Sequence, residues 1–307
     1  MIKTVVDKFY FIQRGWLNAN HFVFNGQNKI LIDTGYKKEL NETLSLIKQT
    51  GVEPSNVDLI ISTHCHCDHI GGNRYIQQLS GCEIATHYID RYFIENQNDW
   101  YTWRRYYDQE ADFFTVHRSV DHGDILMLDE LELIVIHTPG HASGMICLYC
   151  PQHKFLISSD AVWGDGDFGV ITPRIEGIMA PFSQYKSLEK LAALKIKTIY
   201  PGHGNVINNP AEAIQKCKQR LEYFLEDPER MGRDQIKKII LYTLLMKAGF
   251  READFFDYLM NTYWYPETAN LYFAGQYKDI YNSIIKELIN KKMVYKGQGK
   301  LIASLQA

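Results

Sequence analysis

The chain has 307 residues, of which 46% are hydrophobic and 22% are charged, and its formal net charge is −3 at pH 7. These values are typical of a soluble globular protein, and the length favours one large domain with a smaller one beside it. The small negative charge provides no global field that would attract nucleic acid or an anionic membrane.

The N-terminal segment carries neither the apolar stretch nor the small-residue cleavage site of a secretory signal. The longest apolar runs, such as residues 131–137 and 239–246, are far shorter than the roughly 20 residues that cross a bilayer. We therefore expect a cytoplasmic protein with no membrane partner. The cysteines fit that compartment, and Cys147 and Cys150, on an apolar strand-like run, are expected to be buried free thiols.

The first two hundred residues alternate short apolar runs with turns, a pattern typical of β-strands. Residues 21–35 predict a hairpin around Gly26-Gln27-Asn28, and residues 37–51 predict a helix that ends at Gly51. Further strands are predicted within residues 57–64, 131–141, 146–161 and 196–204. These strands end in polar, glycine-rich loops, which indicates a functional site built on loops over a rigid sheet.

Residues 89–121 form an insert in which the pattern changes. The stretch 90–114 is crowded with Tyr, Trp and Phe, and its spacing predicts a helix. Two interpretations remain open. The helix could pack on the core, or it could act as a lid that presents aromatic side chains such as Trp103 to a substrate.

After Pro210 the strand pattern nearly disappears. Amphipathic helices are predicted over residues 211–225, 233–249, 252–264 and 277–292. Residues 293–304 then predict a short hairpin around Gly297-Gln298-Gly299. Helices followed by a hairpin are the outline of a winged helix. We therefore expect a catalytic domain at residues 1–208 and a mostly helical, winged-helix-like domain at residues 209–307.

The stretch Ser62–Asn73, "STHCHCDHIGGN", concentrates potential metal ligands. In an extended chain alternate residues face the same way, so His64 and His66 project together while Cys65 and Cys67 face the other side. Asp68 and His69 follow at the turn. Imidazoles and carboxylates suit zinc, iron or manganese, and four ligand-type residues this close indicate two metal ions rather than one.

Two metal ions need further ligands, and the ends of later strands supply candidates. His141, Asp160 and His203 each follow a β-like run and lie beside glycines that allow close approach of the backbone. The shared context favours ligands over isolated structural residues. The other histidines lack it and are expected to be structural, except that His21 on an early strand remains a candidate substrate contact.

The motif T-H-C-H-C-D-H-I-G-G resembles the H-x-H-x-D-H motif of the metallo-β-lactamase fold superfamily, and "LIDTG" with Asp33 resembles its early structural motif. The resemblance covers roughly residues 10–208 and implies an α/β fold, an αββα sandwich with the site at one edge. It also implies the metal ligands. One metal ion would be held by His64, His66 and His141, and the other by Asp68, His69 and His203, with Asp160 bridging.

Such a centre predicts a hydrolase that uses a bridging hydroxide, because metal binding lowers the pKa of water from about 15.7 towards 7. Zinc is the expected metal, with iron and manganese as alternatives. Asp68 is the predicted catalytic residue, since it could orient the hydroxide or carry a proton to the leaving group. Asp33 is expected to fix the motif loop. The ligand set resembles glyoxalase II and the acyl-homoserine lactonases, which implies a thioester, lactone or related acyl substrate.

Two alternative functions stay open. The helical tail also resembles that of the lactamase-β-like endoribonucleases, but its Lys and Arg residues barely outnumber its Asp and Glu residues, whereas phosphate binding needs a basic surface. A nucleic-acid partner is therefore the lesser expectation. Persulfide dioxygenases, which use a single iron ion, keep similar motifs and form the second alternative.

The loop after Asp160 carries Trp163 and Phe168 among glycines, so it is expected to line the pocket. With Trp103 from the aromatic insert, these residues predict a partly apolar or aromatic group on a small-molecule substrate. The helical tail is expected to serve as a lid or as the interface of a homodimer.

Overall fold

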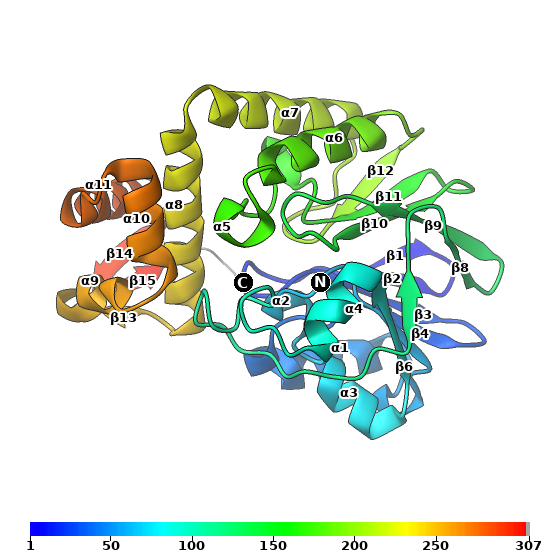
Figure 1. The fold of residues 1–307 in the computed structure, drawn as a ribbon. Helices are drawn as coiled ribbons and strands as arrows, with labels where there is room; N and C mark the ends of the chain where they lie inside the picture. The colour runs from blue at the N-terminus through cyan, green and yellow to red at the C-terminus, as the bar shows by residue number, and fades with distance from the viewer. Residues whose placement is uncertain (305–307) are drawn as a thin grey trace.

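The computed structural model describes residues 1–304, and two β-sheets face each other at its centre (Figure 1). The first sheet follows chain order: β1 (Ile2–Val6), β2 (Phe9–Ile12), β3 (His21–Asn25), β4 (Lys29–Ile32), β5 (Leu59–Ile61), β6 (Glu83–His87) and β7 (Arg118–Val120). The second sheet has the order β12 (Thr198–Pro201), β11 (Phe155–Ser159), β10 (Ile146–Cys150), β9 (Leu131–His137) and β8 (Ile125–Leu128). Because β4, β5 and β6 are parallel, as are β11 and β12, each sheet presents several carboxyl ends at one edge.

Helices cover the outer face of each sheet (Figure 1). The first sheet packs on α1 (Leu40–Gln49), α3 (Asn73–Ser80) and α4 (Tyr88–Glu95), and the second on α6 (Ala180–Ala192) and α7 (Pro210–Glu226). Between the sheets lies an apolar layer in which Phe9 and Phe155 meet at 6.0 Å between ring centroids. The layer order confirms the predicted αββα sandwich. The short segments are η1 (Lys37–Glu39), η2 (Pro54–Asn56), α2 (Cys67–Ile70), η3 (Gly164–Gly166) and α5 (Pro173–Glu176).

The C-terminal part is mostly helical and ends in a small sheet. Its elements are α8 (Pro228–Met246), β13 (Phe250–Arg251), α9 (Glu252–Met260), α10 (Trp264–Phe273), α11 (Tyr277–Asn290), β14 (Val294–Gly297) and β15 (Lys300–Ala303). The sheet order β13-β15-β14 and the closing hairpin agree with the winged-helix-like outline predicted from the sequence. Residues 305–307 of the expected C-terminal domain lie outside the described residues. Within residues 1–304 no helix is long and apolar enough to span a bilayer.

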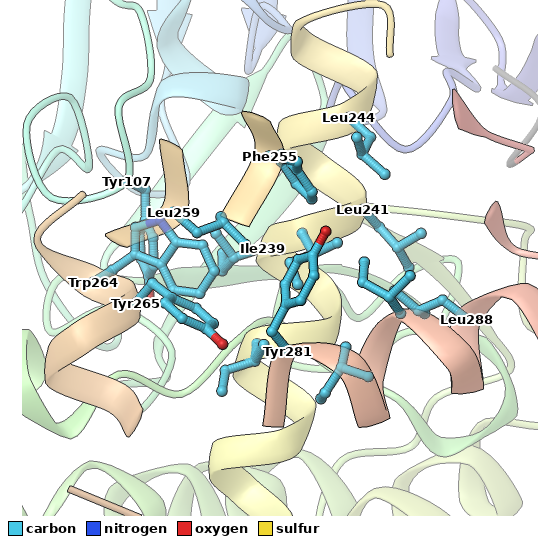
Figure 2. Packing of buried hydrophobic residues seen from close by; sticks show 14 of the residues in the cluster. Tyr107, Ile239, Leu241, Leu244, Phe255, Leu259, Trp264, Tyr265, Tyr281 and Leu288 are labelled. Carbon is cyan, nitrogen blue, oxygen red and sulfur yellow. The ribbon is translucent and has the colours of Figure 1, made fainter. Parts of the chain in front are cut away.

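The long helix α8 stands between the sandwich and the remaining C-terminal helices (Figure 1). Its side chains Leu241 and Leu244 lie in the apolar core of the C-terminal part, together with Trp264, Tyr281 and Leu288 (Figure 2). The same core takes in Trp103, Tyr106 and Tyr107 from the aromatic insert. The insert therefore connects the sandwich to the C-terminal part through packing.

The expectation of a helix over residues 90–114 is wrong beyond Glu95, where α4 ends. The following segment is a series of turns with positive φ at Gln97, Trp103 and Asp108. The Asn98 side chain accepts hydrogen bonds from the amides of residues 100 and 101, which stabilises a turn instead of a further helical turn. The aromatic side chains that suggested an amphipathic helix instead reach packing partners in two different parts of the molecule.

Candidate metal centre

The motif loop leaves β5 and is fixed by one buried carboxylate. Asp33 accepts hydrogen bonds from the amide of Thr63 at 2.8 Å and from its hydroxyl at 2.7 Å, and it lies 2.8 Å from Nδ1 of His69. This confirms the predicted role of Asp33. The helical turn of α2 then places Asp68 and His69 next to each other, and the whole loop is buried.

Three later strand or loop ends meet this loop. His141 follows β9, Asp160 follows β11 directly, and His203 follows β12. The structure brings all the predicted ligands together in groups whose ligand atoms lie within 4.8 Å of one another: His64, His66 and His141; His64, His69 and Asp160; and Asp68, His69 and His203.

Asp160 lies between the first and the third of these groups. One oxygen, Oδ2, is 3.3 Å from Nε2 of His141, and the other, Oδ1, is 3.4 Å from Nε2 of His69 and 3.8 Å from Nε2 of His203. The indole of Trp163 donates a hydrogen bond to Oδ1 at 3.1 Å. The carboxylate therefore has the position that a bridging ligand would need.

Contacts on the outer side of the rings orient their inner nitrogens. Nδ1 of His69 faces Asp33, and Nδ1 of His141 lies 2.7 Å from the carbonyl oxygen of Val170. Nδ1 of His64 lies 3.2 Å from the hydroxyl of Ser159. Within residues 1–304, Nε2 of His64 and Nε2 of His69 have no hydrogen-bond partner although they are buried. Buried ring nitrogens aimed at carboxylates and at each other fit divalent metal ions, and the outer contacts are those of metal-binding histidines.

The charge states also suit a metal centre. Burial, reinforced by neighbouring imidazoles, holds the pKa of His64 and of His66 well below the usual value, and burial also lowers the pKa of His141. His69 differs: burial opposes its positive charge, but the carboxylates of Asp160, Asp33 and Asp68 outweigh burial and raise its pKa well above the usual value. Burial would raise the pKa of Asp160, but the adjacent imidazoles lower it. The neutral imidazoles of His64, His66 and His141 and the ionised carboxylate of Asp160 are the forms that bind zinc, iron or manganese, whereas a metal ion would have to displace a proton from His69.

The cysteines of the motif face away from these groups, as predicted. Sγ of Cys67 donates to the carbonyl oxygen of Thr102 at 3.0 Å, and Sγ of Cys65 lies 3.7 Å from that of Tyr101. Burial raises the pKa of both thiols, so both stay protonated. The cysteines within residues 1–304, including Cys147 and Cys150, are buried and free, which confirms that expectation.

A further cluster joins His87, Asp121 and His137. The two rings stack at 4.0 Å, but Nδ1 of His87 accepts from the amide of Ile89 and its Nε2 faces Asp121 at 3.3 Å. Nε2 of His137 faces the carbonyl oxygen of Ser143 at 2.8 Å. One nitrogen of each ring is held by the backbone and the Asp121 side chain is exposed, which agrees with the structural role expected for these histidines.

A cavity of about 230 Å³ adjoins the candidate metal centre. Asp68, His141, Asp160 and His203 form part of its wall. Much of the rest is apolar or aromatic and comes from distant parts of the chain: Trp16, Trp103, Trp163, Val170, Leu241, Tyr242, Leu245, Leu288 and Met293. The C-terminal part of the chain therefore supplies part of the cavity wall, an arrangement that agrees with the lid expected from the helical tail.

Two of the four predicted substrate contacts line the cavity, and two do not. Trp103 and Trp163 line the cavity, and the ring of Trp103 stacks on His66 at 3.6 Å. Phe168 does not line it, because its side chain is fully buried against Phe224. The neighbouring Gly169 approaches the centre instead, so closely that a Cβ there would lie 2.4 Å from Nδ1 of His141.

His21 does not line the cavity either. Its side chain is fully buried in the sheet region, and within residues 1–304 neither ring nitrogen has a hydrogen-bond partner. Burial and the charge of Arg14 lower its pKa to about 3. In contrast, Trp16 was not predicted, although its ring packs against Trp163 at 5.4 Å and stacks over His203 at 6.0 Å. The sequence signal for Trp16 was only a tryptophan between turn residues.

Comparisons with known proteins agree with this geometry. The family model for the metallo-beta-lactamase superfamily matches residues 14–203, more than half of the chain. The "Beta-lactamase-like protein 2 homolog" of Drosophila melanogaster is 28% identical over 225 residues, which are 70% of this chain and 71% of that protein. The "Acyl-coenzyme A thioesterase MBLAC2" of Gallus gallus is 28% identical over 165 residues, which are 48% of this chain and only 57% of that protein.

A solved structure extends the likeness to the C-terminal part. The metallo-beta-lactamase family protein TTHA1429 from Thermus thermophilus has a TM-score of 0.63 at 17% identity, and the match covers 98% of this chain and 100% of that one. At this identity the likeness concerns the fold. It shows that the sandwich and the C-terminal helices occur together in another protein.

Proposed function

The chain belongs to the metallo-beta-lactamase superfamily, and from this premise we propose that it is a binuclear metal-dependent hydrolase of acyl compounds, with thioesters as the first candidate substrates and lactones as the second. The observation that carries the proposal is the convergence of seven imidazole and carboxylate side chains beside an apolar cavity. Asp160 joins two groups of ligands in one centre, which supports two metal ions rather than one.

The ligands divide between two metal positions. His64, His66 and His141 would hold one ion, Asp68, His69 and His203 the other, and Asp160 would contact both. Zinc suits this set of nitrogen and oxygen ligands, as do iron and manganese. When bound, the ions would supply a hydroxide nucleophile near neutral pH and polarise the carbonyl oxygen of the substrate.

We propose that Asp68 transfers a proton to the leaving group. It lines the cavity, and its Oδ2 lies 3.1 Å from Nε2 of His203 and 3.9 Å from Nε2 of His69. A carboxylate at the boundary between the ligands and the cavity would accept a proton at the oxygen that faces the substrate and donate it to the leaving group. The contact from Trp163 would keep the carboxylate of Asp160 in the bridging orientation.

The cavity supports an acyl substrate. Three tryptophans, Trp16, Trp103 and Trp163, surround the approach to the ligands, and α8 adds Leu241 and Leu245. Such a wall removes water from an apolar acyl group and stabilises it by about 25 cal/mol for each Å² buried. The relative named as an acyl-coenzyme A thioesterase supports a thioester as the first class to test.

The proposal is tested by elemental analysis of the purified protein, followed by a panel of thioesters, lactones, phosphodiesters and glutathione persulfide. We expect two divalent ions per chain, and thioester turnover that is lost on chelation and restored by zinc. A single ion at full loading, together with unchanged turnover in Asp68→Ala, would contradict the binuclear proposal. Preferred cleavage of phosphodiesters would favour a nuclease, and oxygen-dependent turnover of the persulfide would favour a dioxygenase.

A further inference from the structure

Three cationic side chains surround a single carboxylate where α8 meets α11. Glu287 lies 2.9 Å from Arg233, 3.1 Å from Lys237 and 2.8 Å from Lys291, measured between nitrogen and oxygen atoms. We call these four residues the cation cluster. Burial opposes ionisation of Glu287, but the three bases lower its pKa to about 2. The carboxylate is therefore charged, and it balances only one of the three positive charges.

Two bases of the cation cluster reach the cavity beside the candidate metal centre. Lys237 and Lys291 line the same cavity as Asp68 and His203. Leu288 and Met293 flank Lys291 on this part of the wall. One continuous cavity therefore extends from the predicted metal ligands, past the apolar side chains of α8, to a site of surplus positive charge.

The other charged residues of the wall are balanced. Lys238 lies 2.7 Å from Asp167 and 3.0 Å from Asp234, and Arg220 lies 2.6 Å from Asp234. These two bases and two acids satisfy one another, and Lys238 also donates to the carbonyl oxygen of Phe168 at 2.7 Å. Apart from the predicted metal ligands, the uncompensated charge of the cavity wall thus comes from the cation cluster.

The cluster is also accessible. The exposed fraction of the side chain is 24% for Lys237, 33% for Arg233 and 56% for Lys291. A contact that served only to hold α8 against α11 would need one base for one acid. Two unbalanced bases at the end of a cavity are instead the arrangement that binds an anion.

We propose that the cation cluster binds an anionic group, a phosphate or a carboxylate, on the thiol portion of a thioester substrate, while the acyl end reaches the metal centre. This inference rests on the proposed acyl hydrolase function. It places the departing thiol at the part of the cavity formed by α8 and α11. The linker or the acyl chain would then lie along the apolar wall between the cation cluster and the metal centre.

The test compares three thioesters that carry the same acyl group on pantetheine, on 4′-phosphopantetheine and on glutathione. The first thiol is neutral, the second adds one phosphate, and the third carries carboxylates. We expect kcat/KM at low ionic strength to be about tenfold higher for an anionic thiol than for pantetheine, since each partly exposed ion pair contributes up to about fivefold. The preference should decline as salt is added. Preference for the phosphate or for the carboxylates identifies the anion.

Variants connect the preference to the cluster. Lys237→Gln with Lys291→Gln should reduce the ratio of kcat/KM between the anionic and neutral thioesters to about one. Lys286→Gln is the matched control, because Lys286 is exposed on α11 and does not line the cavity. It should leave the ratio unchanged. The ratio does not depend on the fraction of folded protein, so a loss of stability in the double variant does not obscure the result.

The possible failures are distinct. Equal kcat/KM for all three thioesters would overturn the anion site while leaving the hydrolase proposal in place. A preference that survives in the double variant would also overturn it. If no thioester is hydrolysed at all, the proposed function fails, and the anion site fails with it.

Discussion

The metal centre and the cavity wall differ in how the chain builds them. Each ligand of the candidate centre follows a strand or lies in the loop after one. Outer contacts such as that between Asp33 and His69 come from the ends of the same sheets, and His141 is held by Val170 in the loop after Asp160. The wall is assembled from a turn near Trp16, the aromatic insert, the loop after Asp160 and the helix α8. The centre thus depends on rigid strand ends, whereas the wall depends on packing between distant segments. We expect substitutions of the metal ligands to change the metal content and kcat, and substitutions in the cavity wall to change mainly KM or the free energy of unfolding.

The largest expected effect is that of Asp160→Ala. Removing the carboxylate that lies between the ligand groups should lower kcat by about a thousandfold or more and reduce the metal content below two ions per chain. Elemental analysis and turnover measured on the same sample check both quantities. If metal content and kcat both stay at the wild-type level, Asp160 is not a ligand and the proposed centre is wrong.

The second prediction concerns the cavity wall, where we expect a substitution to lower the free energy of unfolding. Lys238→Met leaves Asp167 and Asp234 with Arg220 as their only base in this network, and Lys238 is only 15% exposed. We expect the free energy of unfolding to fall by about 2 kcal/mol, because two poorly hydrated carboxylates then share one positive charge. Urea denaturation measures the change. The matched control is Lys186→Met at an exposed position of α6, which should change it by less than about 0.5 kcal/mol.

The same contrast explains what the sequence could predict. The strand ends and the motif could be predicted because the alternation of side chains and the spacing of His64, His66 and Asp68 are local properties. The helix expected beyond Glu95 was wrong because aromatic side chains such as Tyr106 and Tyr107 pack against the C-terminal core instead of forming one helical face. The sequence allowed a lid formed by the helical tail, but it could not assign that role to α8, because no local pattern tells which distant cavity a helix will line.

A third prediction separates the wall from the core within one loop. Trp163→Ala should raise KM for an apolar thioester by about tenfold, because the indole buries part of the acyl group. The metal content should stay at the wild-type level because all seven predicted ligands remain, whereas loss of the indole contact to Asp160 should also lower kcat. Phe168→Leu is the matched variant in the same loop, and it should lower the midpoint of thermal unfolding without a change in KM, since Phe168 packs in the core. A higher KM in Phe168→Leu and an unchanged one in Trp163→Ala would reverse the assignment.

The effect that we expect to be smallest at neutral pH concerns His21, whose side chain lies in the core of the sheet region and not at the cavity. Its pKa is lowered to about 3 by burial and by Arg14, whereas an unfolded chain would protonate this imidazole near pH 6.5. As the pH falls below 6.5 the unfolded state therefore gains a proton that the folded state does not, and stability is lost by about 1 kcal/mol per pH unit towards pH 3. In His21→Leu this contribution should disappear, so the difference in the free energy of unfolding between variant and wild type should grow in favour of the variant on acidification. Denaturation at pH 7, 6 and 5 measures the trend. A constant difference across that range, or a raised KM at pH 7, would return His21 to the substrate site.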